Sequence, residues 1–154
     1  SMHCPGDMRT KSRLPGKGWA YDSYSKASGM SGEVGGSAWD NIKVFKKVAE
    51  VAEPVSSMVF TEEADSRGYN NGTWALNATG WVDPFAIFHG NVSTIGFLDG
   101  HVELHRWLDG RTIKAARDSA KGIDSFFWAG GTKTNPDFRW TYDKYRYVNW
   151  KPSY

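Results

Sequence analysis

The dipeptide Asp99-Gly100 is the strongest constraint on the fold, because it stands between two stretches that alternate apolar and polar residues. These stretches are STIGFL (93–98) and HVELHRW (101–107). A tight two-residue turn needs positive φ at both central residues, which an Asp-Gly pair tolerates. The sequence therefore predicts a β-hairpin with Asp99-Gly100 as its turn and Gly100 at positive φ.

A two-residue turn also fixes the register, because a slip of one residue moves every side chain to the other face. One face is then predicted to hold the apolar residues Ile95, Phe97, Val102 and Leu104. The other would carry His101, Glu103 and His105, which could offer zinc two imidazoles and a carboxylate. A solvent-facing strand shows the same polar alternation without a metal, so we expect no tightly bound transition metal.

His89 is the main catalytic candidate, because it could act as a base that Asp99 orients. A nucleophile elbow of the form Gly-x-Ser-x-Gly is absent from the sequence. The single cysteine, Cys4, excludes an internal disulfide and a thiolate cage, and we expect it to be a small buried residue. We therefore predict no catalytic residue and interpret His89 as a structural residue that hydrogen-bonds beside the Asp99 turn.

Shorter patterns predict the remaining elements. Apolar residues at 39, 42, 45, 48 and 49 have helical spacing and predict a short helix that Pro54 closes. Residues 55–65 predict a strand that ends in acids, 72–82 a second strand or extended excursion, and 109–122 a short helix or turn. The glycine-rich residues 5–37 predict long loops held by Trp19, Tyr21 and Tyr24.

The composition fits one globular domain over residues 3–154, after a Ser1-Met2 pair that resembles a cloning remnant. A net charge of +2, with no long run of like charge, gives no support to nucleic-acid binding. No apolar stretch approaches the roughly 18 residues that a membrane span needs. The unusual feature is the aromatic content of 8 Trp, 7 Tyr and 8 Phe, more than a core of this size usually takes.

Many of these rings fall in the tail, 123–154, which is predicted to be largely irregular. FRWTYDKYRYVNW (138–150) alternates rings with charges, so a strand there would line one face with aromatic side chains. Such rings can stack on sugars while arginine pairs with carboxylate or sulfate groups. The predicted binding residues for a polysaccharide, preferably an anionic one, are Trp128, Trp140, Tyr142, Tyr145, Tyr147, Trp150, Arg139 and Arg146.

An acidic loop, 62–72, is a candidate calcium site because it supplies oxygen ligands. These are Glu62, Glu63, Asp65, Asn70 and Asn71. Their spacing does not match the twelve-residue EF-hand loop, so a solvated acidic loop is the alternative interpretation.

Several motifs resemble the prepilin-type H-X9-DG family. His89, nine intervening residues and Asp99-Gly100 match its defining pattern, and FLDGHVELHRW (97–107) is similar to its F-x-DGH-x-E-x-x-x-W ending. HCPGD (3–7), SYSKASGMSG (23–32), EPVSSMVFTEE (53–63) and NPDFRWTYDKY (135–145) resemble further segments of the family. The chain departs from the family in its basic, aromatic tail and in the lack of a second cysteine.

The resemblance implies an α+β fold, namely a pseudopilin-like head with a small antiparallel sheet, long irregular loops and an aromatic-rich C-terminal extension. It implies a bacterial protein of a type II secretion-like system, held at the cell surface or in the periplasm by an N-terminal hydrophobic helix that this sequence lacks. Other pseudopilins would be partners through that helix. His89, Asp99 and Gly100 would be the structural family motif.

Two functions follow for such a head, which is expected to need no cofactor. The expected function is that of a surface or periplasmic head that binds polysaccharide, and the alternative is a purely structural subunit for filament assembly and protein secretion, with no glycan binding. A polysaccharide-degrading enzyme is a third alternative, which would need paired carboxylates across a cleft. The sequence does not place Glu62, Glu63 and Glu103 relative to a cleft.

Overall fold

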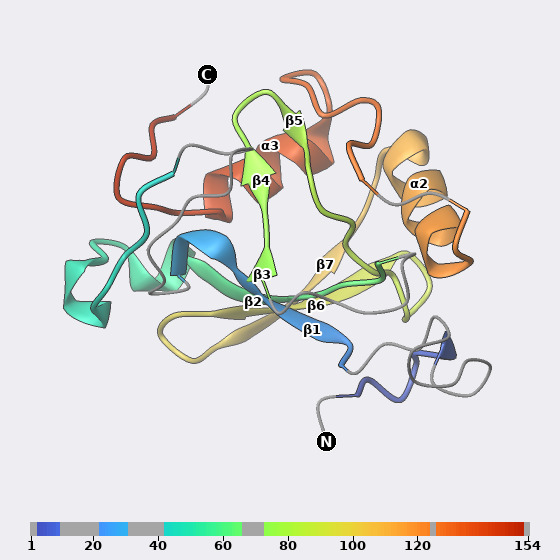
Figure 1. Ribbon diagram of the computed structural model, residues 1–154, viewed down its shortest axis with the longest axis horizontal. Coiled ribbons are helices and arrows are strands. Elements are labelled where there is room, and N and C mark those ends of the chain that lie inside the picture. The colour runs from blue at the N-terminus through green and yellow to red at the C-terminus, as the bar shows by residue number, and fades with distance from the viewer. Residues whose placement is uncertain (1–2, 10–21, 31–41, 66–72, 124–125, 153–154) are drawn as a thin grey trace.

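The computed structural model describes residues 3–9, 22–30, 42–65, 73–123 and 126–152 and shows an α+β fold (Figure 1). A five-stranded sheet has the order β3-β1-β2-β6-β7. Its strands are β1 (Tyr24–Ala27), β2 (Met58–Glu62), β3 (Thr73–Trp74), β6 (Val92–Phe97) and β7 (Val102–Arg106). The other regular elements are β4 (Leu76–Asn77), β5 (Gly80–Trp81), α2 (Gly110–Ala120), α3 (Pro136–Lys144) and the 3-10 turns η1 (Ser28–Met30), η2 (Val48–Glu50) and η3 (Pro54–Ser56).

The sheet is mixed rather than antiparallel throughout. β1 pairs antiparallel with β2, β2 with β6 and β6 with β7, whereas β3 runs parallel to β1. The predicted α+β class is therefore confirmed. The prediction of an antiparallel sheet is wrong at one edge, where β3 runs parallel to β1. Among the described helices, none has the length and hydrophobicity that would let it span a bilayer.

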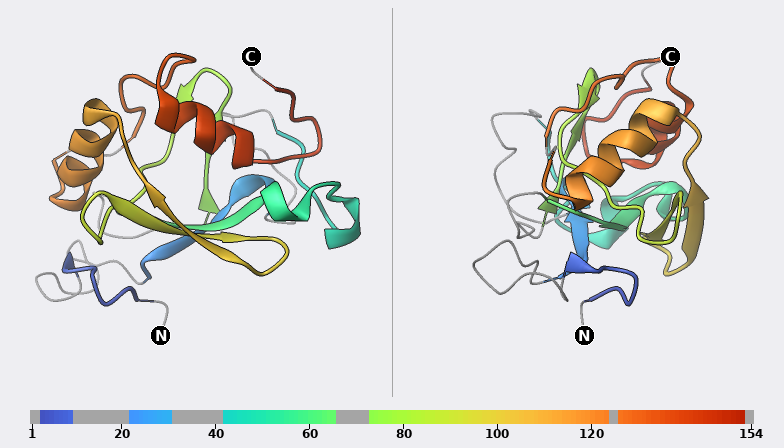
Figure 2. Two further views of the ribbon diagram at one scale, coloured as in Figure 1. Left: turned by 180° about the vertical axis from the view of Figure 1, so that it is seen from behind. Right: turned by 90° about the vertical axis from the view of Figure 1, so that its right-hand side faces the viewer.

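Helices α2 and α3 and the β4–β5 pair lie on one side of the sheet, and the N-terminal segment lies on the other (Figures 1 and 2). We call the sheet face toward the helices the core face and the opposite one the outer face. The core is built from aromatic rings. Trp81 lies at its centre and contacts the rings of Phe85, Trp107, Trp128 and Phe138.

The β6–β7 hairpin forms as predicted, but its turn is one residue longer. The Phe97 N–H donates to the His101 carbonyl and the Gly100 N–H to the Phe97 carbonyl, so the loop is Leu98-Asp99-Gly100. Gly100 has the predicted positive φ, at 95°. A turn whose last residue has left-handed φ forms a bulge and closes a three-residue hairpin.

This extra loop residue makes the predicted register wrong. Ile95 faces Glu103 rather than Leu104 across the hairpin, and every β7 side chain moves to the other face. Val102 and Leu104 are exposed on the outer face. His101, Glu103 and His105 turn toward the core side, where His101 stacks on Phe97 and His105 stacks on Trp140. They therefore do not form the solvent-facing set of zinc ligands that the sequence pattern suggests.

The predicted strand over 55–65 is confirmed as β2, and the segment 72–82 contains β3, β4 and β5. The segment 109–122, predicted as a short helix or turn, forms the helix α2. The Asp109 carboxylate caps α2 by accepting from the N–H groups of Arg111 and Thr112. Tyr24 lies half-buried in β1, whereas Trp19 and Tyr21 fall outside the described residues.

The predicted helix closed by Pro54 is wrong over its described part. Residues 42–47 are not helical, and only the short η2 and η3 turns follow. The backbone there bonds to other parts of the chain: the Lys43 carbonyl accepts from Val148 and the Phe45 N–H donates to Gly29. Tertiary bonds of this kind take the groups that an i to i−4 helix would need.

The predicted strand in the aromatic tail is also wrong, because residues 136–144 form helix α3. The Asn135 side chain accepts from the N–H groups of Asp137 and Phe138, and Pro136 occupies the first turn. An asparagine cap followed by proline is a typical helix start. The alternation of rings and charges therefore does not produce a ring-lined strand.

Candidate functional site

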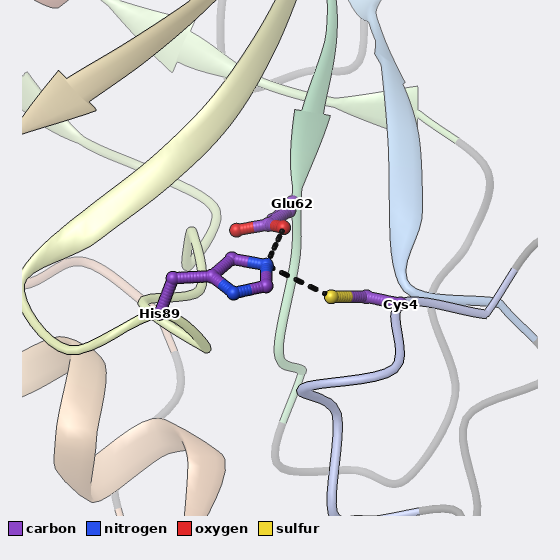
Figure 3. Close-up of side chains that lie close together, drawn as sticks. All are labelled: Cys4, Glu62 and His89. Atoms are coloured by element: carbon purple, nitrogen blue, oxygen red, sulfur yellow. Dashed lines mark hydrogen bonds and ion pairs between the residues drawn. The ribbon is translucent and has the colours of Figure 1, made fainter.

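Three side chains from distant parts of the sequence, Cys4, Glu62 and His89, meet at one end of the outer face (Figure 3). The His89 Nε2 atom lies 3.1 Å from the Cys4 Sγ atom and 3.2 Å from Glu62 Oε1. One ligand-type atom from each residue lies within 4.8 Å of the other two. Among the described residues, no other group of three or more His, Cys, Asp or Glu side chains meets this criterion.

Strand β2 places Glu62 in the cluster. Its neighbour Thr61 pairs with Ile95 on the core face, so Glu62 points to the outer face. Glu62 is fully buried there, and its Oε2 atom accepts a hydrogen bond from the Thr94 N–H at 3.3 Å. Its Oε1 atom accepts no hydrogen bond from the described residues. Burial raises the pKa of this carboxyl group, which the contacts with Thr94 and His89 partly offset.

The motif HCPGD places Cys4. The Asp7 N–H donates to the Cys4 carbonyl, which closes a turn, and the Cys4 N–H donates to the Ser23 hydroxyl just before β1. The thiol is buried, and burial raises its pKa. Tyr24 lies beside it, and burial raises the pKa of that phenol to about 12. A thiol with a raised pKa is a poor nucleophile at neutral pH.

A buried ion pair fixes the same segment. The Asp7 carboxylate accepts two hydrogen bonds from the Arg9 guanidinium and one from the Ser23 hydroxyl. Arg9 also donates to the Glu63 carbonyl. Gly6 lies so close to Phe88 that a Cβ atom there would come within 2.9 Å of the Phe88 carbonyl oxygen. The contacts in this segment therefore explain why Cys4, Gly6 and Asp7 occupy their positions, whereas none explains Pro5.

His89 joins the cluster from the loop before β6, with its side chain 43% exposed. The prediction that it hydrogen-bonds beside the Asp99 turn is wrong. Asp99 lies past the far end of β6 and binds His101, with 2.6 Å between Asp99 Oδ1 and His101 Nδ1. His89 and Asp99 therefore lie beyond opposite ends of β6. The length of this strand explains why nine residues separate them in the sequence.

The cluster differs from a catalytic triad in one respect. In a triad the nucleophile and the carboxylate contact different imidazole nitrogens, so that a proton can pass between them. Here the thiol and the carboxylate both lie against Nε2, and one hydrogen atom cannot point to both. The arrangement resembles a set of ligands around a common centre, or a hydrogen-bonded lock between three segments, more than a relay.

The predicted sugar-binding rings are mostly inside the core. Trp128, Tyr142, Tyr145 and Tyr147 are buried, whereas Trp140 and Trp150 are half-buried. The Arg146 guanidinium lies 3.7 Å from the Trp150 ring centroid and covers it. Arg139 and Trp140 line a shallow hollow with Pro136 and Asp143. The eight predicted residues therefore do not form one exposed platform, because most of their rings pack into the core.

The acidic residues proposed for calcium do not gather either. Glu62 points to the cluster described above, whereas the pKa of Glu63 is raised by its own burial and then by Asp83 and Asp65. Consecutive strand residues point to opposite faces, which separates the two carboxylates. Asn70 and Asn71 fall outside the described residues. Glu103 lies on β7, two strands away from β2 in the sheet.

Sequence reasoning missed the cluster although it singled out His89, Cys4 and Glu62 separately. The contact between Cys4 and His89 spans 85 positions. Only the family motifs around Cys4 and His89 signalled that both positions were special.

Comparisons with known proteins identify no relative of this chain. No family model, no curated protein and no solved structure matches the chain. The resemblance to the H-X9-DG family therefore rests on the quoted motifs alone.

Proposed function

We propose that the domain is a non-enzymatic, pseudopilin-like head that serves as a structural subunit of a type II secretion-like system. An N-terminal hydrophobic helix would anchor it in a bacterial membrane and bring it together with other pseudopilins, at the cell surface or in the periplasm. The observation that carries this proposal is an exposed apolar strip on the outer face, formed by Phe60, Val102 and Leu104.

The side chains of the strip come from β2 and β7, on either side of β6. Gly96 lies between Phe60 and Val102 and contributes no side chain, and Leu104 follows on the same face of β7. Phe60 is 43%, Val102 61% and Leu104 72% exposed. Apolar side chains grouped on a surface are typical of contacts with other protein segments. The strip therefore supports an assembly role.

The N-terminal segment lies on the same side of the sheet. The buried pair of Asp7 and Arg9 and the cluster around Cys4 hold this segment against the outer face. A helix that precedes residue 3 would thus enter on the side of the apolar strip, where it or a neighbouring subunit can cover Val102 and Leu104. Burying a leucine side chain contributes about 1.5–3 kcal/mol, so covering Leu104 would stabilise the contact between the head and the helix or neighbouring subunit.

The test is to produce the protein with its N-terminal helix in cells that assemble the secretion system and to measure its amount in the sheared filament fraction. Leu104→Ser is expected to lower this amount several-fold, because it removes the most exposed apolar side chain of the strip. Ile123→Ser is the matched control, since Ile123 is equally exposed, at 72%, but follows α2. Equal recovery of both variants, or no wild-type protein in the fraction, would contradict the proposal.

Polysaccharide binding is the second candidate, and the hollow beside Trp140 favours it. One face of this ring stacks on His105, with 3.6 Å between ring centroids, and exposed Arg139 lies beside it for an anionic group. Affinity electrophoresis in gels with a uronic acid polymer, a sulfated polymer and a neutral glucan tests it. We expect retardation of the wild type that Trp140→Ala abolishes and Trp150→Ala retains. Equal mobility in all gels would exclude this candidate.

A further inference from the structure

We propose that Cys4, Glu62 and His89 bind a divalent transition metal of the zinc type, which fastens the N-terminal segment to the sheet. This departs from the sequence-based expectation of no metal, which considered only His101, Glu103 and His105 as ligands. It does not depend on the secretion role, because it concerns only the contacts within this domain.

The distances from the imidazole nitrogen to the other two ligand atoms are close to those of a zinc site, and the sulfur and the oxygen lie within 4.8 Å of each other. Zinc lies about 2.3 Å from sulfur and about 2.0 Å from nitrogen or oxygen, so tetrahedral ligands are roughly 3.3–3.5 Å apart. The distances from His89 Nε2 are 3.1 Å to Cys4 Sγ and 3.2 Å to Glu62 Oε1. An outward shift of a few tenths of an ångström therefore makes room for the ion between the three atoms.

The buried carboxylate is the second, independent observation. Glu62 is fully buried, and its Oε1 atom points to the cluster, where its ion pair with His89 Nε2 at 3.2 Å does not have hydrogen-bond geometry (Figure 3). Burying a carboxylate is costly unless positive charge and hydrogen bonds compensate it. A metal ion at the centre would place two positive charges beside this carboxylate, in addition to its contact with His89.

The donor set selects the metal. One thiolate, one imidazole and one carboxylate suit a borderline-soft ion such as zinc, whereas calcium and magnesium prefer oxygen ligands alone. A thiolate and a carboxylate also balance the two charges of the ion, which keeps a partly buried site neutral. With three protein ligands, the fourth position is left for water, which reaches the site from the side of the exposed His89 ring.

The consequence is a cross-link between three segments. Cys4 belongs to the N-terminal segment, Glu62 to the interior strand β2 and His89 to the loop before β6. A metal that binds only the folded arrangement stabilises it by mass action. The ion would thus fix the N-terminal segment on the outer face in the same place as the Asp7–Arg9 pair.

The experiment uses protein purified without a polyhistidine tag and freed of metal with a chelator. Zinc is titrated against a chromophoric competitor, and cobalt is added separately to record its absorption spectrum. The variants are Cys4→Ser, Glu62→Gln and His89→Gln, with His101→Gln as the matched control on the hairpin. Near-ultraviolet circular dichroism, which is sensitive to the tryptophan-rich core, checks that each metal-free variant is folded.

We expect the wild type and His101→Gln to bind one equivalent of zinc, to melt at a higher temperature with it and to give a sulfur-to-cobalt charge-transfer band. Each site variant should lose affinity by at least about tenfold, which is the smallest effect usual for altered metal sites. Failure of folded wild type to bind one equivalent would overturn the proposal, as would unchanged affinity in folded Cys4→Ser and His89→Gln. If Cys4→Ser does not fold, the absence of the band in the wild type overturns it equally.

Discussion

His105 illustrates how much one residue's environment depends on the hairpin register. The predicted register turned this imidazole to solvent, but the observed one packs it against two tryptophan rings. Its ring stacks on Trp140 and lies edge-on to Trp107. Burial lowers the pKa of His105, although Asp137 and Glu103 act in the opposite direction. By contrast, the hydrogen bond that His101 donates to the Asp99 carboxylate raises the pKa of His101, which lies on the same face of the hairpin.

We predict that a proton NMR titration gives His105 a pKa below the ordinary value of about 6.5 and His101 a pKa above it. Because the unfolded chain binds the His105 proton more readily, this residue's contribution to stability falls as the pH drops through the unfolded pKa toward the folded one. Trp140→Ala should expose the ring and raise the pKa of His105 while leaving His101 unchanged. Identical pKa values for the two residues in the wild type would contradict the stacked arrangement.

At the scale of elements, local sequence patterns predicted the strands, helices and turns that contacts between neighbouring residues stabilise. The strand β2 and the β6–β7 hairpin were found where expected, and the segment 109–122, expected as a short helix or turn, forms α2. The register failed because an Asp-Gly pair serves either a two-residue turn or a three-residue turn with a bulge. The helix over 37–54 failed because Lys43 and Phe45 use their backbone groups in long-range bonds, which no local pattern reveals.

The turn also yields a test with a matched control. Gly100 has φ 95° with open space around it, so a side chain there meets no clash but forces a strained backbone. Gly100→Ala should destabilise the domain by about 1 kcal/mol, and Gly100→Val by more, because a β-branched residue fits positive φ worst. Chemical denaturation measures the change.

Gly110→Ala is the control for this substitution. Gly110 also has open space, but it begins α2 without positive φ, so alanine should leave the stability unchanged or raise it slightly. Equal effects of alanine at both positions would mean that the turn does not need a left-handed residue.

At the scale of the whole molecule, the aromatic content and the N-terminal motif find their explanations in long-range packing. The sequence showed a surplus of rings and suggested a sugar-binding tail, whereas most of the tail rings are buried in the core that includes Trp81. Edge-to-face pairs such as Trp81 with Phe138 contribute about 0.5–1.5 kcal/mol beyond the area they bury. Neither this core nor the Cys4 cluster follows from local patterns, because both join segments that lie far apart in the sequence.

The last prediction concerns the buried pair that holds the N-terminal segment. Asp7 and Arg9 are 1% and 4% exposed, and Arg9 Nη2 lies 2.8 Å from Asp7 Oδ2. Removing one partner leaves the other charge buried, which costs about 3–5 kcal/mol, whereas replacing both with apolar residues removes that penalty. Asp7→Leu and Arg9→Met should therefore each destabilise the domain strongly, and the double variant should cost clearly less than the sum of the two. Urea unfolding of the four proteins gives this coupling. Additive effects would show that the segment is held by other contacts, with the ion pair contributing nothing of its own.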